Sequence, residues 1–513
     1  MLSIYASTEL LPTIREYIAG EERLDELVEV HDFLTVKPVF SAFHFMVRPK
    51  QGITHPIDWY NVLPPYLLPE EIPFSRENLL GLVFSKLGNG EKMHAWLAEN
   101  PSLLHELDIL SRLQHGIPVD AAELHSDFQP FEEYRFCHNA AVVHHYASEE
   151  QRFDPEKTEY FYREAVQNAP NGEYAAFSAR QYALFLIDLN ALDGAEEVLQ
   201  QAIPFVLSDE AALELRATLC QVWMKKLTVP YDPALLERLK TNLWDVLEHY
   251  RRLGRDVEEG LTLIDAAQIA HYADSFAEAL GYINRAVSIF RQEQIPELLA
   301  QAHHRRALLL YTWAKNGSPQ FFKGALESFK EALKVFNRED APEVFAEMQQ
   351  YLGIIYAEMP DETLKRGVWA ALSASAFQEA LAFFAKDRHP YEYAMVCNHY
   401  GNALTKYPPA VHSDNIEKAL FYYNEALGIR RADRFPLERA TTLLNFVEAC
   451  WHLNLEGKGA NTALFEEMVA KTNEALHLSD DPHIRDEAHR HLERLESLRA
   501  ALQLEGESMP DPA

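Results

Sequence analysis

Three pairs of histidines are the residues of this sequence whose type could bind a metal ion or move protons: His144–His145, His303–His304 and His489/His491. Adjacent histidines on a helix point in different directions, and no HExxH pattern or Cys/His spacing accompanies them. The stretch KLGNGEK (86–92) superficially resembles a phosphate-binding loop, but it lacks the glycine spacing and the following Ser or Thr. No nucleophile and base stand at a recognisable spacing. We therefore expect no catalytic residues, no bound metal and no cofactor.

Four scattered cysteines contain no CxxC pair: Cys137, Cys220, Cys397 and Cys450. This usage is typical of free thiols in a reducing compartment. The amino terminus lacks a basic start followed by an apolar run, and no stretch approaches the roughly 18 apolar residues of a membrane span. The sequence predicts a cytoplasmic protein.

The charge balance limits the partners that this chain can bind. Its 513 residues are 48% apolar and 24% charged, and 47 basic against 78 acidic residues give a formal net charge of −31. A field of this sign opposes the approach of DNA, RNA or an acidic lipid surface. Acidity also keeps a long protein soluble, which needs no functional explanation. We expect a protein or peptide partner, with no nucleic acid and no membrane, and the oligomeric state stays open.

A spacing pattern recurs through the second half of the chain. In EALKVFNREDAPEVFAEMQQYLG (331–353), Ala332 precedes Pro342 by ten positions, and Ala346 follows that proline by four. Three further copies begin at Ala286, Ala380 and Ala426, so the alanines recur at intervals of 46, 48 and 46 residues. Self-similarity at such a period indicates stacked repeats.

From about residue 131 onward, apolar residues recur at three and four positions, and the predicted helices come in pairs. A single helix hairpin cannot bury its own apolar face, so each hairpin must stack on its neighbours. Residues 1–125 do not fit the repeat. They contain TVKPVFSAFHFMV (35–47), the only strand-like stretch, and NPSLLHELDILSRL, a helix expected to begin with Asn100 as N-cap and Pro101 at its first position.

These patterns divide the chain into four predicted parts. They are a small, mostly helical amino-terminal domain of unknown role, helical repeats, a charged capping helix and a disordered tail, at residues 1–125, 126–478, 479–504 and 505–513.

The repeats resemble the tetratricopeptide repeat (TPR). In that family a small residue stands where the two helices of a hairpin cross, and the second helix carries a small–aromatic–small series. The matching crossing positions are Ala307, Gly353, Gly401 and Val447, and the matching series are Ala325–Phe329–Ala332, Ser373–Phe377–Ala380 and Ala419–Tyr423–Ala426. The resemblance implies an all-α, right-handed solenoid of helix hairpins.

The repeat length departs from the usual TPR period of about 34 residues. Over about residues 276–450, the long units with Pro-x-x-x-Ala are similar to repeats found beside bacterial caspase-like (CHAT) protease domains. No protease domain follows them, so no peptidase activity is implied. This closer resemblance implies a bacterial protein.

In a TPR-like stack the first helices line the concave face. The positions three before, one after and four after each crossing residue should face a partner-binding groove on this side. They are His304, Leu308, Tyr311, Gln350, Ile354, Ala357, Asn398, Asn402, Thr405, Leu444, Glu448 and Trp451. The amide side chains offer donors and acceptors to an extended peptide, and the aromatic ones offer contact area. A surface without a ligand would have the same composition. A carboxylate clamp is not expected, because Asn402 has no lysine partner at 398 and Glu448 would repel a carboxylate.

A second candidate surface is a cluster of arginines in an acidic chain: Arg430, Arg431, Arg434 and Arg439. It could receive an acidic partner segment, although arginines at a helix end are also favoured by the helix dipole.

The sequence therefore predicts a protein–protein interaction scaffold or adaptor whose groove binds a peptide or helix. The alternatives are a peptide-sensing regulator whose amino-terminal domain transmits the signal, and an enzyme with its site in residues 1–125.

Overall fold

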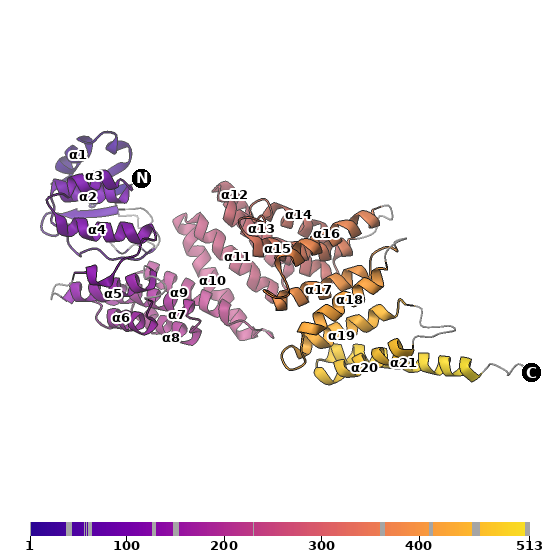
Figure 1. Cartoon of the computed structure of the whole chain (residues 1–513). Coiled ribbons are helices and arrows are strands. Elements are labelled where there is room, and N and C mark those ends of the chain that lie inside the picture. The colour runs from indigo at the N-terminus through magenta and orange to yellow at the C-terminus, as the bar shows by residue number, and fades with distance from the viewer. Residues whose placement is uncertain are drawn as a thin grey trace, which may run out of the picture. The chain divides into compact units, whose positions relative to one another are not determined.

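A computed structural model describes residues 2–36, 44–55, 57, 59, 64–125, 130–146, 153–228, 230–359, 365–409, 414–453 and 462–507. By its internal contacts the chain divides into an N-terminal unit, Met1–Ala273, and a C-terminal unit, Asp274–Ala513. Figure 1 shows helices through most of both units. The division falls within the predicted repeat region, so each unit contains helix hairpins.

The N-terminal unit begins with a four-stranded sheet in the order β2-β1-β3-β4. The strands are β1 (Leu2–Ala6), β2 (Val28–Asp32), β3 (His44–Arg48) and β4 (Gly52–Thr54). Strand β1 pairs in parallel with β2 and β3, and β4 is antiparallel to β3. The helices of this region are α1 (Leu11–Ala19), α2 (Arg76–Lys86), α3 (Gly90–Trp96) and α4 (Pro101–Gln114), with short 3-10 turns at Leu24–Glu26 and Ala121–Glu123.

The predicted strand-like stretch 35–47 overlaps β3, while its residues 37–43 lie outside the described part of the chain. Strands β1, β2 and β4 were not predicted. They have only five, five and three residues, and all five residues of β1 are buried. A short run without alternation cannot be distinguished from helix by periodicity. The expected start of α4 is confirmed, because the Asn100 side chain accepts a hydrogen bond from the Leu103 N–H and Pro101 is the first helical residue.

Helical hairpins fill the rest of the N-terminal unit, as the 3.6-residue periodicity predicts. Their helices are α5 (Pro130–Tyr146), α6 (Pro155–Gln167), α7 (Gly172–Asp188), α8 (Leu192–Ala202), α9 (Asp209–Lys226), α10 (Pro233–Leu253) and α11 (Asp256–Tyr272), with a 3-10 turn at Ile203–Phe205. Successive helices of this series pack on one another.

The C-terminal unit continues with α12 (Phe276–Gln292), α13 (Pro296–Lys315), α14 (Phe322–Ala332), α15 (Pro342–Glu358), α16 (Arg366–Phe383), α17 (Pro390–Leu404), α18 (Asn415–Ile429), α19 (Pro436–Cys450), α20 (Thr462–Leu478) and α21 (Pro482–Glu507), and with a 3-10 turn at Pro319–Phe321. The hairpins are α13–α14, α15–α16, α17–α18 and α19–α20. Helix α21 packs on α19 and α20 and begins three residues after the start of the predicted capping helix, 479–504. It continues to Glu507, three residues into the predicted tail, and residues 508–513 of that tail lie outside the described residues.

The recurring Ala–Pro–Ala spacing now has a structural explanation. Each repeated proline is the first residue of a first helix (α13, α15, α17 or α19), where its fixed φ suits the helix and its missing N–H costs nothing. The alanines before and after each proline are buried, at most 2% exposed. They are small because one hairpin packs closely on the next at these positions.

The crossing positions pack as the repeat predicts. A Cβ atom added to Gly353 would lie 2.8 Å from the Phe377 ring, and one added to Gly401 would lie 2.5 Å from the Tyr423 ring. Both aromatic rings come from the middle of the small–aromatic–small series on the second helix. The predicted register of the hairpins is therefore confirmed at these two crossings.

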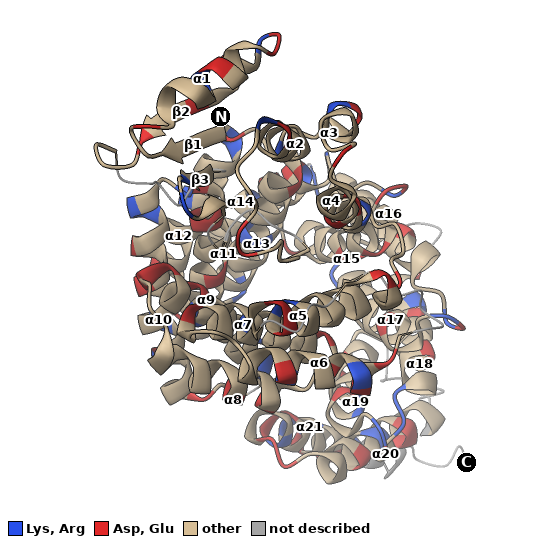
Figure 2. Ribbon diagram, turned by 90° about the vertical axis from the view of Figure 1, so that its left-hand side faces the viewer, with Lys and Arg blue, Asp and Glu red and all other residues tan. Residues whose placement is uncertain are grey.

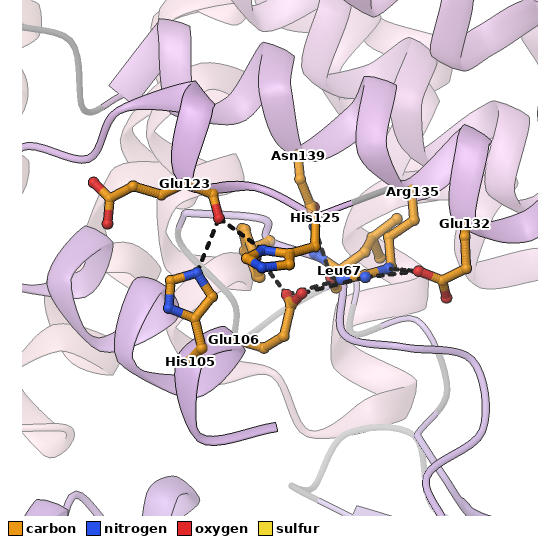
Figure 3. A network of polar contacts seen from close by, with 9 residues as sticks. Leu67, His105, Glu106, Glu123, His125, Glu132, Arg135 and Asn139 are labelled. Carbon is orange, nitrogen blue, oxygen red and sulfur yellow. Dashed lines mark hydrogen bonds and ion pairs between the residues drawn. The ribbon is translucent and has the colours of Figure 1, made fainter. Parts of the chain in front are cut away.

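Polar residues of α5 attach the amino-terminal region to the first hairpins (Figure 3). The segment at residues 64–68 contains Pro64 and Pro65 and belongs to no sheet. The Asn139 amide exchanges two 2.8 Å hydrogen bonds with the Leu67 backbone, and His138 Nε2 donates to the Pro65 carbonyl at 2.8 Å. These α5 residues are fully buried. They satisfy backbone groups that a sheet would otherwise satisfy.

A buried ion pair joins α4 to the same face of α5. Arg135 Nη1 donates to Glu106 Oε2 at 2.8 Å, and the Tyr66 hydroxyl donates to the same carboxylate oxygen at 2.6 Å. Arg135 also pairs with Glu132. Glu106 and Arg135 are each only 5% exposed. Figure 3 shows both side chains pointing toward each other between the two helices.

The buried His138 predicts acid sensitivity. Burial lowers its pKa to about 4, although the hydrogen bond to Pro65 acts in the opposite direction. An unfolded histidine titrates near 6.5, so below that pH the unfolded chain takes up a proton that the folded chain does not. Stability is therefore lost as the pH falls from about 6.5 to about 4, by roughly 2 to 3 kcal/mol.

The measurement is urea unfolding at pH 7.5 and pH 4.5 for the parent and His138→Gln. We expect the free energy of unfolding to fall less between these two pH values in His138→Gln than in the parent, by roughly 2 to 3 kcal/mol. The matched control is His115→Gln, because His115 is exposed. If the parent and His138→Gln lose equal stability over this range, His138 does not carry the effect.

Candidate functional site

The C-terminal unit contains a cavity of about 410 Å³ among its first helices. We call it the α13–α19 cavity, because all but one of its lining residues come from α13, α15, α17 and α19 or from the turns that end them. The lining residues are Tyr311, Lys315, Ile354, Ala357, Glu358, His399, Asn402, Ala403, Thr405, Lys406, Tyr423, Asn445, Glu448, Ala449 and His452. The exception is Tyr423, which lies on α18.

Half of the predicted groove positions line this cavity: Tyr311, Ile354, Ala357, Asn402, Thr405 and Glu448. They stand one or four residues after a crossing residue. Such positions recur on neighbouring first helices at equivalent heights, so stacking brings them together.

Three predicted positions are instead buried between helices. Gln350, Asn398 and Leu444 are 2%, 5% and 1% exposed. Each stands three residues before a crossing residue, so it is turned only about 60° away from that residue and faces the packed side of the hairpin. The cavity is lined instead by His399 and Asn445, which directly follow Asn398 and Leu444 in the sequence.

The remaining predicted positions lie outside the cavity lining. The Trp451 indole donates to His491 Nδ1 at 3.1 Å, and the Arg494 guanidinium stacks on the indole at 3.9 Å, so α21 covers this side chain. His304 lies 5.9 Å from the Phe329 ring, and burial lowers its pKa to about 4. Leu308 packs partly buried against the core around Phe329.

One end of the cavity holds charged residues that the sequence reasoning missed. Lys315, at the end of α13, and Lys406, after α17, both pair with Glu358 at the end of α15. Burial alone would raise the pKa of Glu358, but the hydrogen bonds and charges of Lys406 and Lys315 hold it below its ordinary value. We call these three residues the lysine–glutamate triad. The predicted groove extended only to the fourth residue after each crossing residue. The triad lies further along, at the fifth residue (Glu358 and Lys406) and the eighth residue (Lys315).

Uncharged polar groups also line the cavity: His399, Asn402 and Asn445. The Gln350 amide donates to His399 Nδ1 at 2.8 Å, which places the ring hydrogen on Nε2. Burial, together with the charges of Arg430 and Lys315, lowers the pKa of His399 to about 4, so the ring is neutral at pH 7. Asn402 Oδ1 accepts from the Tyr423 hydroxyl at 2.7 Å, and Asn445 Nδ2 donates to Asn398 Oδ1 at 3.1 Å.

The arginines of this cluster mainly bind other residues of the same chain. Arg430 is 5% exposed and donates to the Thr442 hydroxyl at 2.6 Å. Arg439 donates to the carbonyls of Leu427 and Arg430 at the end of α18 and pairs with Glu474. Arg431 pairs with Asp433. Arg434 is exposed. Because three of the four guanidinium groups have partners within the chain, we base no proposal on this cluster.

Figure 2 shows acidic and basic residues on the helices of both units. Within the described residues, no group of three or more His, Cys, Asp or Glu side chains is placed to hold a metal ion. The same residues contain no helix that is both long and apolar enough to cross a bilayer.

The helix hairpins, with a small residue under an aromatic ring at Gly353 and Gly401 and a proline at the start of each later first helix, identify the repeat. The fold is a TPR-like α-solenoid. Helix hairpins occupy both units, and the sheet of the N-terminal unit is a minor addition to them. The resemblance to the repeats of caspase-like proteins remains one of sequence spacing.

No family model and no curated protein matches the sequence. Among solved structures, the chain is similar to a signal-transduction ATPase with a tetratricopeptide repeat sensor from Pyrococcus horikoshii, at 15% identity and a TM-score of 0.49. That match covers 77% of this chain and 54% of the ATPase, so the chain spans about half the length of that protein. A Rap protein complexed with competence and sporulation factor is similar at 10% identity and a TM-score of 0.42, over 80% of this chain and 98% of the other. At this level the likeness concerns the fold.

Proposed function

We propose that this TPR-like protein is a scaffold or adaptor that binds a peptide or helix of a partner protein in the α13–α19 cavity, without chemistry of its own. The observation that carries the proposal is that four consecutive first helices contribute to one cavity. Its volume lies within the range of about 300 to 1,000 Å³ that is usual for small-molecule sites. We retain as partner-binding residues the six predicted groove residues that line the cavity: Tyr311, Ile354, Ala357, Asn402, Thr405 and Glu448.

The composition of the cavity supports a peptide partner. Tyr311 offers a large, rigid contact surface. Asn402 and Asn445 line the cavity, and each uses one end of its side-chain amide in a hydrogen bond within the protein. Extended backbone offers both N–H and C=O groups to such amides.

The test fills the cavity and compares partner recovery. Ala357→Trp places an indole in the cavity, whereas Ala371→Trp makes the same change on the exposed face of α16. We expect the tagged parent and Ala371→Trp to recover the same partner from source cells, identified by mass spectrometry. We expect Ala357→Trp to recover about tenfold less, because the indole occupies the binding volume.

Circular dichroism of the two variants controls for folding. Equal recovery by Ala357→Trp and Ala371→Trp would show that the partner binds elsewhere on the chain.

A further inference from the structure

The α13–α19 cavity has a positive end. The lysine–glutamate triad contains two ammonium groups and one carboxylate, so its net charge is positive. Each lysine is 45% exposed, while Glu358 is 21% exposed. The ammonium groups are therefore more accessible to a ligand than the carboxylate that they share.

The part of the cavity contributed by α19 is negative. Glu448 lines the cavity and its side chain is 57% exposed. In the described part of the chain no lysine or arginine pairs with it, and its nearest basic group is His491 at 3.8 Å. Burial lowers the pKa of His491, so the imidazole does not neutralise Glu448 at pH 7. On α21, the acidic Glu487 and the basic Arg490 and Arg494 also act on His491. None of these three residues lines the cavity, whereas Glu448 does.

The cavity lining also contains neutral donors and acceptors, on Asn402 and Asn445. Asn402 Oδ1 is occupied by Tyr423, which leaves the Asn402 amino group as a donor for a ligand. Asn445 Nδ2 is occupied by Asn398, which leaves the Asn445 carbonyl oxygen as an acceptor. One donor and one acceptor match the C=O and N–H groups of a peptide backbone.

We propose that the cavity selects a dipolar peptide, in which an acidic group lies at Lys315 and Lys406 and a basic group lies at Glu448. This inference rests on the proposed function and adds the charge pattern of its ligand. The opposite charges of the triad and Glu448 disfavour a segment with charges of one sign, because one of the two would then repel it.

The probe is a random dodecapeptide library displayed on phage and selected against the full chain. We expect the enriched peptides to contain an acidic and a basic residue at a constant spacing. A synthetic copy of one such peptide is then titrated by fluorescence polarisation. Glu448→Lys and Lys406→Glu should each weaken its binding by about tenfold, because each reversal places like charges together.

A swapped peptide provides the specificity control. Replacing its basic residue by Glu should restore binding to Glu448→Lys and weaken binding to the parent. The matched protein control is Glu466→Lys on α20, an exposed charge reversal away from the cavity, which should leave the affinity unchanged.

Two outcomes separate the two proposals. If Ala357→Trp abolishes binding but Glu448→Lys and Lys406→Glu bind like the parent, the dipolar ligand is wrong and the peptide-binding cavity stands. If Ala357→Trp binds like the parent, or if the library gives no enrichment over that variant, both the cavity and its charge pattern are wrong.

Discussion

Gly401→Leu is expected to lower the free energy of unfolding of the C-terminal unit by about 3 kcal/mol. The first added carbon would lie 2.5 Å from the Tyr423 ring, which is 1% exposed and held by its hydroxyl bond to Asn402. The ring therefore has little room to move, and a leucine adds three more carbons. Because stacked repeats depend on their neighbours, the damage should extend to α15 and α19.

Urea unfolding gives the magnitude, and hydrogen exchange of α15–α20 gives the extent. Gly428→Leu is the matched control, because it is the same substitution on the adjacent helix α18 and its added Cβ meets no atom within 4 Å. It should be neutral or stabilise by up to about 1 kcal/mol through helix propensity. If the two variants were equally stable, the assigned helix crossing would be wrong.

Arg135→Met should cost the N-terminal unit about 3 to 5 kcal/mol, because it leaves the buried Glu106 carboxylate without its cationic partner. Among the described residues, the Tyr66 hydroxyl would remain as a hydrogen-bond donor to that carboxylate. We expect the loss to appear in urea unfolding and as faster hydrogen exchange in α4 and α5. The backbone amides of the segment at residues 64–68, which Asn139 and His138 of α5 bind, should also exchange faster.

Arg112→Met is the control for this prediction, since Arg112 also makes a two-bond pair with a glutamate, Glu123, in the same unit. That pair is about one-third exposed, so its loss should cost about 1 kcal/mol or less. The double variant Glu106→Leu/Arg135→Met should recover part of the loss, because it removes both buried charges. If the double variant were no more stable than Arg135→Met, the uncompensated charge would not explain the cost.

The repeat could be predicted at the level of single residues because its determinants are local and recur. A proline that starts a helix and small residues at close contacts leave the same spacing in each copy, as at Pro342, Pro390, Gly353 and Gly401. The start of α4 at Asn100 is local in the same sense.

The sheet and half of the predicted groove positions show the limit of this reasoning. Strand β1 is specified by its pairing with β2 and β3, whose residues lie about 25 and 40 positions away in the sequence, and not by its own alternation. Gln350 and Asn398 have the side chains expected of a groove, but the rotation of each first helix against its neighbours buries them and presents His399 and Asn445 instead.

The sequence by itself determined that this chain is a stack of helix hairpins, where those hairpins begin and which small residues lie at two of their crossings, because periodicity, caps and close contacts are set by nearby residues. The tertiary structure alone decided that Lys315, Glu358 and Lys406 meet at one cavity, with Glu448 lining it as well. These residues come from four repeats, and no local signal relates their side chains. Their meeting depends on how each helix is rotated against the next.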